Sequence, residues 1–293
     1  MKEKWIIIKI AVVADIHTNL LALNLALEDA KENNVEKYIF LGDYITDGED
    51  SNDVLELVKQ YSDYAIIGNR EKYILKYNKE KEKYNNYKTI SYTYNSLSKK
   101  SKDYIKKLKE HMIIKINNLR ILLIHGDIYL KKPNERKLFY DRIIENYHDF
   151  DICLYGHSHI YYDEIYKGYH FINPGSIGQP TDSSTYKYCI LNIDNTINVQ
   201  LREFSVKESF QEFEQKYKNT KYYKENYIWS NLILDTIREG KDYCNLFLDI
   251  LNSKLNNKKS LGEEEYNKIW EETFADYSHI CNKNNKTHRK YIE

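Results

Sequence analysis

The 293-residue chain has no run of apolar residues that approaches the length of a membrane-spanning helix. Such a helix needs about 20 consecutive apolar residues. The apolar run near the N-terminus, residues 5–13, is short, is interrupted by Lys9 and is followed at once by Asp15. It also lacks the small-residue cleavage site that ends a secretory signal peptide. We therefore interpret this run as a first strand and expect a soluble, cytoplasmic protein with no membrane partner.

The sequence also lacks net charge and closely spaced cysteines. Its 44 basic residues balance its 44 acidic residues, so the charge balance gives no support for a nucleic acid as partner. The four cysteines form no Cys-x-x-Cys pair, which favours free thiols in a reducing cytosol over a disulfide framework. They are Cys153, Cys189, Cys244 and Cys281.

Strand and helix patterns alternate along the first part of the chain, which is typical of the parallel sheet of an α/β protein. Apolar strands are predicted at residues 6–14, 38–41 and 64–67, with helices at 20–33 and 51–60, the second of them capped by Ser51. Residues 71–111 are rich in Lys, Tyr and Asn and predict two or three helices with solvated faces.

Further strands follow, and then the strand signal ends. A hairpin is predicted at 112–116 and 120–124, a helix at 135–147, and strands at 151–155, 161–166, 169–172, 186–193 and 196–204. Residues 205–293 predict three or four helices, so we expect one domain over residues 1–204 and a helical extension over residues 205–293. The apolar stripes of the extension need burial, by default against the first domain. We expect these helices to donate no ligands but to lie near the cleft or a dimer interface, and a homo-oligomer is left open.

Side chains that can bind metal ions follow the predicted strands. In open α/β sheets, ligands bind at the carboxyl ends of strands. Each of these side chains taken alone is more often structural, and the signal is their joint order. The seven oxygen and imidazole groups are too many for one tetrahedral zinc and fit two metals that share a carboxylate. They are Asp15, His17, Asp43, Asn69, His125, His157 and His159.

The motifs that contain these residues resemble those of the calcineurin-like metallophosphoesterase superfamily. Asp-x-His, Gly-Asp, Gly-Asn, His-Gly and Gly-His-x-His occur in that order, and the resemblance covers residues 6–204. It implies a four-layer αββα sandwich and a phosphoester hydrolase. In two-metal sites of this kind the ions lie about 3.5–4 Å apart, clamp the phosphate and generate hydroxide from water. By motif, Asp15, His17 and His159 would hold one ion, Asn69, His125 and His157 the other, and Asp43 would bridge them.

The third motif departs from the family pattern, because Arg70 stands where the family has a histidine that is its proposed proton donor. Arginine cannot act as a general acid near neutral pH, but its planar guanidinium can hold phosphate oxygens. We therefore expect Arg70, with Asp43 and His125, to act in catalysis while a hydroxide that bridges the ions attacks phosphorus. The alternative is that Arg70 only pairs with Glu71 or with another surface acid.

Residues 173–180 look like the closing turn of small bacterial phosphoesterases, a subgroup that includes phosphodiesterases and dinucleoside polyphosphate hydrolases. The resemblance thus implies a nucleotide or other small phosphoester as substrate. It implies two divalent metal ions as cofactors, manganese first, with iron, zinc, nickel and cobalt as alternatives. Ser176 could donate a hydrogen bond to a ligand or only shape this turn, and Asp127 could orient a ligand histidine or be a solvated loop acid.

Two rival functions are weighed. A non-catalytic scaffold on the same fold, binding partners through its C-terminal helices, would not need to keep all seven ligands. A protein Ser/Thr phosphatase would need arginine-rich phosphate clamps that have no match in this sequence. Both are therefore disfavoured relative to the small-molecule phosphoesterase.

Overall fold

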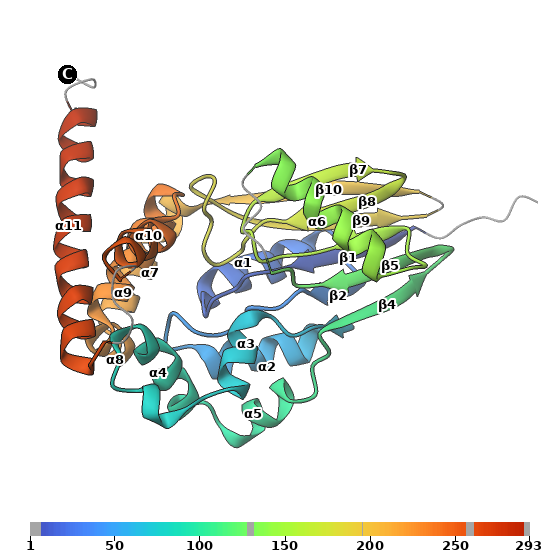
Figure 1. Cartoon of the computed structure of the whole chain (residues 1–293). Helices are drawn as coiled ribbons and strands as arrows, with labels where there is room; N and C mark the ends of the chain where they lie inside the picture. The colour runs from blue at the N-terminus through green and yellow to red at the C-terminus, as the bar shows by residue number, and fades with distance from the viewer. Residues whose placement is uncertain (1–6, 128–131, 195, 256–260, 290–293) are drawn as a thin grey trace, which may run out of the picture.

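Two five-stranded mixed sheets form the centre of the molecule (Figure 1). The computed structural model describes residues 7–127, 132–194, 196–255 and 261–289. The first sheet has the order β10 (Ile197–Ser205), β9 (Thr185–Ile193), β1 (Ile8–Val13), β2 (Lys37–Phe40) and β3 (Tyr64–Ala65). The second has the order β4 (His111–Ile116), β5 (Leu119–Ile124), β6 (Ile152–Leu154), β8 (Tyr169–Pro174) and β7 (Tyr161–Tyr166). Strands β1, β2 and β3 are parallel, as are β5, β6 and β8, and the other pairings are antiparallel.

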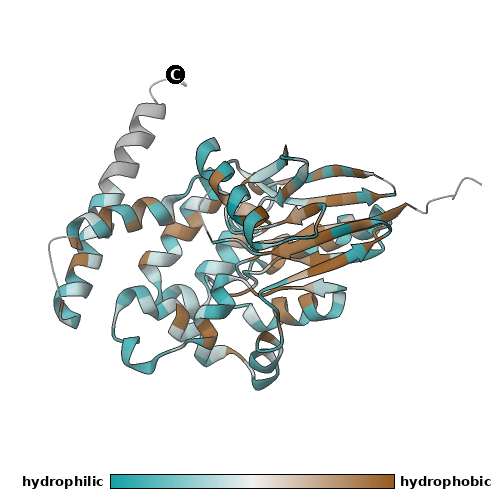
Figure 2. Ribbon diagram, turned by 45° about the vertical axis from the view of Figure 1, so that its right-hand side comes forward, coloured by the Kyte–Doolittle hydropathy of each residue, from teal (hydrophilic) through white to brown (hydrophobic). Residues whose placement is uncertain are grey.

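The central strands are apolar throughout because both of their faces are buried. In β1, Ala11 and Val13 pack under a helical layer, whereas Ile10 and Val12 pack between the two sheets. This alternation follows from the two-residue period of a strand. Figure 2 shows the result, with hydrophobic residues concentrated in the strands and hydrophilic ones on the outer helices.

Helices cover the outer face of each sheet and complete the predicted αββα sandwich. Helices α1 (Leu20–Glu32) and α2 (Ser51–Tyr61) share a core with the first sheet. On the second sheet lies α6 (Pro133–Asn146), which buries Phe139 and Tyr140 against it. The three helices between residues 69 and 105 agree with the predicted two or three. They are α3 (Asn69–Leu75), α4 (Lys88–Ser96) and α5 (Lys99–Ile105), with short 3-10 turns at Lys79–Lys81 and Asn85–Tyr87.

The structure differs from two local predictions, and a third concerns a residue outside the described ranges. Ser51 does not cap α2, because the helix already begins at Ser51; Asp50 is the N-cap, and the Ser51 hydroxyl is buried without a hydrogen-bond partner. Strand β3 ends at Ala65 rather than at Ile67, because its partner β2 ends at Phe40 and the Ile67 N–H donates to Lys109 instead. The predicted start of the first strand, Ile6, lies outside the described residues.

Within the described residues, five helices follow β10, not the predicted three or four. They are α7 (Val206–Lys218), α8 (Lys221–Glu225), α9 (Tyr227–Glu239), α10 (Tyr243–Leu255) and α11 (Glu263–Arg289). Gly240 ends α9 in the left-handed conformation, φ 61°, where a β-carbon would lie 2.2 Å or less from the Ser183 carbonyl group. Asn226 ends α8 and is followed at once by α9. The apolar stripe predicted over residues 222–234 runs across Asn226, so the sequence pattern did not show that interruption.

The C-terminal helices are packed in two ways. Helices α7 to α9 contribute Val206, Tyr217 and Leu234 to the core that also contains α1 and α2, so the default prediction of burial against the sandwich is confirmed for them. The opposite face of α9 packs with α10 and α11 around Phe247 and Trp270. Figure 1 shows this second group at one end of the sandwich.

Two expectations drawn from absences can be checked in the described part of the chain. No helix there combines the length and the apolar composition needed to cross a membrane. The predicted free thiols are confirmed for Cys153, Cys189 and Cys244. The side chain of Cys281 lies outside the described residues.

Candidate metal centre

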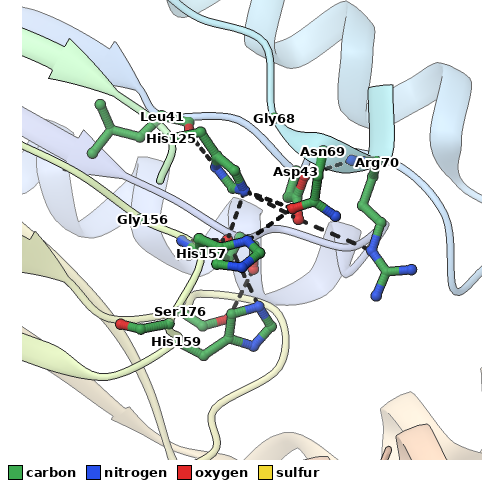
Figure 3. A network of polar contacts seen from close by, with 12 residues as sticks. Leu41, Asp43, Gly68, Asn69, Arg70, His125, Gly156, His157, His159 and Ser176 are labelled. Atoms are coloured by element: carbon green, nitrogen blue, oxygen red, sulfur yellow. Dashed lines mark hydrogen bonds and ion pairs between the residues drawn. The ribbon is translucent and has the colours of Figure 1, made fainter. Parts of the chain in front are cut away.

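All seven residues predicted as metal ligands lie together at one edge of the sandwich, six on loops that follow strands and Asn69 at the start of α3. Figure 3 labels Asp43, Asn69, His125, His157 and His159 among them. Five of them have a left-handed backbone, with φ between 46° and 70°; these are Asp15, His17, Asp43, His157 and His159. Residues other than glycine rarely adopt this conformation, and such strain gathers at functional sites. The loops are thus bent so that their side chains face a common point.

The side chains form two groups. In the first, His17, His159 and Asp15 come together, with His17 Nε2 3.2 Å from His159 Nε2 and His159 Nε2 3.7 Å from Asp15 Oδ1. In the second, Asn69 Oδ1 lies 3.0 Å from His125 Nε2 and 2.9 Å from His157 Nδ1. The Gly156–His159 turn therefore gives one imidazole to each group, as predicted.

Asp43 lies between the two groups. Its Oδ2 atom is 3.3 Å from His125 Nε2 and 3.8 Å from His17 Nε2. Its other oxygen, Oδ1, accepts a hydrogen bond of 2.8 Å from the Arg70 backbone N–H, which fixes the carboxylate plane. One carboxylate oxygen therefore faces both groups, as a bridging ligand must.

Hydrogen bonds on the far side of three imidazoles determine which nitrogen faces the centre. The Nδ1 atom of His17 donates to the Asp47 carboxylate (2.9 Å). The Nδ1 atom of His125 donates to the Leu41 carbonyl (2.7 Å), and that of His159 donates to the Gln179 carbonyl (2.7 Å). In its neutral form each ring therefore presents the Nε2 lone pair to the centre. Although burial opposes its charge, the Asp43 and Asp15 carboxylates raise the pKa of His125 to about 9, so this ring is neutral only when a cation replaces its proton. The Nε2 atoms of His17 and His159 lie 3.2 Å apart, so they either share a proton or face a common cation.

This donor set fits divalent transition metals. Mixed imidazole and carboxylate ligands suit Mn, Fe, Co, Ni and Zn. Burial lowers the pKa of His157 to about 4 and that of His159 to about 3, so both are neutral ligands at pH 7. Burial, with the nearby Asp43 charge, raises the pKa of Asp15 to about 8, so a second negative charge is costly here without a cation.

Arg70 lies beside the centre and pairs with two buried acids. Its Nη2 is 3.6 Å from Asp47 Oδ2 and its Nε is 4.0 Å from Asp43 Oδ2. Asp47 is fully buried, and although burial opposes its charge, Arg70 and His17 hold its pKa well below the usual range. The guanidinium lines the cavity next to the centre, a position from which it can reach a bound phosphate.

Glu71, which the sequence suggested as a partner of Arg70, instead organises two loops. Its buried carboxylate accepts hydrogen bonds from the backbone N–H groups of Gly68 (2.8 Å), Asp43 (3.0 Å), Tyr44 (2.8 Å) and Ile45 (3.3 Å). The loops approach so closely that a β-carbon on Gly68 would lie 2.3 Å from the Asp43 nitrogen. Glu71 thus holds Asp43 and the start of α3 together.

Two of the residues considered in the sequence have other roles. Asp127 does not orient a ligand histidine, because the Leu41 carbonyl already binds His125 Nδ1; Asp127 is exposed and pairs with Arg142, as expected of a solvated loop acid. The Ser176 hydroxyl donates to the Asp15 carbonyl (2.8 Å) and accepts from the Gln179 N–H (2.8 Å). It therefore shapes the turn, which was the alternative reading.

The sequence did not point to Asp47, Gln179 or Trp229 as site residues. The Asp47-Gly48 pair is typical of a turn, yet Asp47 accepts hydrogen bonds from His17 Nδ1 and from Gln179 Nε2 (3.3 Å). The indole of Trp229, on α9, donates to the other Asp47 oxygen at 2.8 Å. An aspartate that follows a ligand strand by a few residues was a usable signal for Asp47, but no sequence signal connected Trp229 with the site.

Helices α9 and α10 form one wall of the centre, which confirms that the C-terminal helices lie near the cleft. A cavity of ≈ 40 Å³ between them and the ligand residues is lined by His17, Asn69 and His159 on one side and by Trp229, Cys244 and Leu248 on the other. The two metal-binding groups found among the described residues, Asp15–His17–His159 and Asp43–His125–His157, include no member from these helices.

Comparison with known proteins agrees with this architecture. The uncharacterized protein MJ0912 of Methanocaldococcus jannaschii is 29% identical over 243 residues, which cover 69% of this chain and 90% of that protein. The probable metallophosphoesterase YsnB of Bacillus subtilis is 32% identical over 93 residues, which cover 32% of this chain and 53% of that protein.

Solved structures show the same fold at low sequence identity. The hypothetical protein PH1004 of Pyrococcus horikoshii has a TM-score of 0.61 and 19% identity, covering 80% of this chain and 98% of that one. A metallophosphoesterase of Sphaerobacter thermophilus has a TM-score of 0.55 and 19% identity, covering 76% of this chain and 99% of that one. The family model of the calcineurin-like phosphoesterase superfamily domain matches residues 8–196. With more than half of its length inside that match, the chain belongs to the calcineurin-like phosphoesterase superfamily.

Proposed function

We propose that this protein is a binuclear-metal-dependent phosphoester hydrolase that acts on phosphodiesters, nucleotides or dinucleoside polyphosphates. The observation that carries the proposal is the position of Asp43, whose Oδ2 atom faces an imidazole of each ligand group at 3.3 Å and 3.8 Å. A shared carboxylate is what a pair of adjacent ions requires.

Each residue of the site would have a defined role. One ion would be held by Asp15, His17 and His159, and the other by Asn69, His125 and His157. Asp43 would bind both ions. Two bound divalent ions, with manganese the first to test, would clamp the phosphate and supply hydroxide as nucleophile. The guanidinium of Arg70 would neutralise phosphate oxygens, because it is a fixed cation on the wall of the same cavity.

Second-layer contacts support this role of the seven residues. The Asp47, Leu41 and Gln179 acceptors keep three imidazoles oriented without a substrate present. Such outer partners raise ligand basicity and preserve ring orientation. The chain would therefore offer a centre whose geometry is set before the ions bind.

The test is the metal content of the purified protein and its manganese-dependent hydrolysis of bis-p-nitrophenyl phosphate. We expect two divalent ions per chain and activity that a chelator removes. A metal-free protein that cannot be activated would contradict the proposal and favour the non-catalytic scaffold.

Asp43→Asn is predicted to remove most of the activity and to weaken both ion sites together, because the bridging carboxylate loses its charge. Elemental analysis and turnover check this, with Asp103→Asn, an exposed position on α5, as the control. Loss of one ion with the other retained at full affinity would contradict the bridging role.

A further inference from the structure

We propose that the organic group of the substrate binds in a groove between α3 and α6, and that this groove accepts one nucleoside-sized aromatic group. The proposal rests on the proposed function, since it concerns the same metal centre. We call this site the α3–α6 groove, and the residues of it that carry the argument are Lys72, Tyr73, Phe139, Arg142, Asn146 and Tyr147.

Two cavities meet at the centre and share Asn69 and His157. The one under α9 and α10 measures ≈ 40 Å³, and the α3–α6 groove measures ≈ 570 Å³. Sites for drug-sized ligands measure roughly 300–1,000 Å³, whereas a water molecule occupies about 30 Å³ of liquid. Of these two cavities among the described residues, only the α3–α6 groove is large enough for a large substituent on a phosphoryl group held at the centre.

The groove has aromatic walls. Tyr73 on α3 leaves 47% of its surface exposed, Tyr147 after α6 is partly buried, and Phe139 on α6 lines the groove but is only 1% exposed. An exposed ring beside a cavity, such as that of Tyr73, is suited to stack on a planar ligand, as aromatic residues do with bases. Asn146, exposed at the end of α6, adds an amide that can bind polar atoms of such a ligand.

The charges of the groove favour a substrate with a single phosphate. Its two cations are each paired with an acid: Lys72 Nζ lies 2.9 Å from Glu110 Oε2, and Arg142 pairs with Asp127. Among the described lining residues the formal charges therefore cancel. A chain of further phosphates would find no excess positive charge there, so the groove fits a nucleoside or a similar planar group better than a polyphosphate.

The test compares thymidine monophosphate with methyl phosphate, two monoesters that differ only in the organic group. Calorimetry on the metal-loaded protein gives the affinity of each monoester. The ratio of the two affinities measures the contribution of the groove separately from that of the metal centre. We expect the wild-type ratio to favour the nucleotide by about ten-fold or more, the effect of one stacked base. Tyr73→Ala should reduce this ratio by about ten-fold. Asn146→Trp, which fills the groove, should reduce it as well.

Matched controls lie on the same helices. Leu75→Ala on α3 and Leu138→Trp on α6 change residues that are 45% and 70% exposed and that do not line the groove, and both should keep the wild-type ratio. Equal affinities of the two monoesters, or a ratio that the groove variants leave unchanged, would overturn the groove while the proposed function stands. Failure of both monoesters to bind the metal-loaded protein would instead contradict the proposed function.

Discussion

At the scale of single residues, the buried carboxylate of Glu71 holds the loop that carries Asp43 in place through hydrogen bonds to its backbone. Four backbone N–H groups donate to its two oxygens, and the side chain is fully buried. Burial and the charge of Asp43 raise its pKa to about 7. A neutral amide in its place would point its own N–H₂ group at backbone donors.

Glu71→Gln is therefore predicted to destabilise the fold by about 1–3 kcal/mol, the penalty for buried donors without acceptors. Chemical denaturation at neutral pH measures it. Glu56→Gln, whose side chain is 56% exposed in a pair with Lys100, should change stability by less than about 0.5 kcal/mol. Equal effects of the two substitutions would show that the Glu71 contacts contribute nothing specific.

Arg70 allows a prediction about the leaving group. General acid catalysis contributes about 10²–10⁴ in rate and matters most for basic leaving groups. Because Arg70 cannot supply a proton, the rate on a series of aryl esters should fall steeply as the leaving-group pKa rises. Arg70→Ala should lower kcat, and Arg70→His should regain activity selectively on poor leaving groups. A flat plot of log rate against leaving-group pKa would mean that another group donates the proton.

At the scale of elements, a hydrogen bond from Trp229 joins helix α9 to the candidate metal centre. The Trp229 indole donates to Asp47, and Asp47 in turn holds His17 Nδ1. The same indole packs with Trp270 of α11, their ring centroids 6.3 Å apart. Packing in the C-terminal helices is thus connected to the orientation of a predicted ligand.

Trp229→Phe is predicted to weaken metal binding by about ten-fold. This is the lower end of the range for removing a hydrogen-bond partner that orients a metal-binding histidine. Titration of the metal-free protein with Mn²⁺ measures this affinity. Trp270→Phe is the control, because it alters the same aromatic packing without contacting Asp47, and it should change unfolding but not metal affinity. A shift in affinity for both variants would assign the effect to packing alone.

At the scale of the whole molecule, the predicted boundary near Ser205 does not coincide with a break in the core. Val206, Phe210 and Tyr217 of α7 are buried together with residues of α1 and α2. Helices α9 and α10 also close one side of the cavity next to the ligands. The division into residues 1–204 and 205–293 stays a prediction, and the packing indicates that the first part relies on the second.

Truncation after Phe204 is accordingly predicted to give an insoluble or unstable protein, because it exposes the face of the core that α7 to α9 cover. A second truncation after residue 255 keeps that core and removes only α11, and it should remain folded with reduced stability. Circular dichroism and mass in solution compare the two. A soluble 1–204 fragment with unchanged kinetics would mean that the helices are a dispensable extension.

The sequence by itself determined the fold class and the chemical types at the site. Each predicted ligand follows a strand within a few residues, so the polypeptide backbone fixes its place at the carboxyl end of the sheet whatever the rest of the chain does. The order of strands and helices was likewise readable from apolar periodicity, and the errors lay at boundaries. Helix α2 begins at Ser51 rather than being capped by it, and β3 ends before Ile67 because its partner strand β2 ends first.

Only the tertiary structure decided which groups orient these ligands. His125 is held by the backbone carbonyl of Leu41, a group that every residue has and no sequence pattern marks. Asp47 and Trp229 are 182 residues apart, and their contact exists only because α9 packs against the first helical layer. Ligand types are encoded locally, whereas hydrogen-bond partners and cavity walls depend on which surfaces meet when the whole chain is packed.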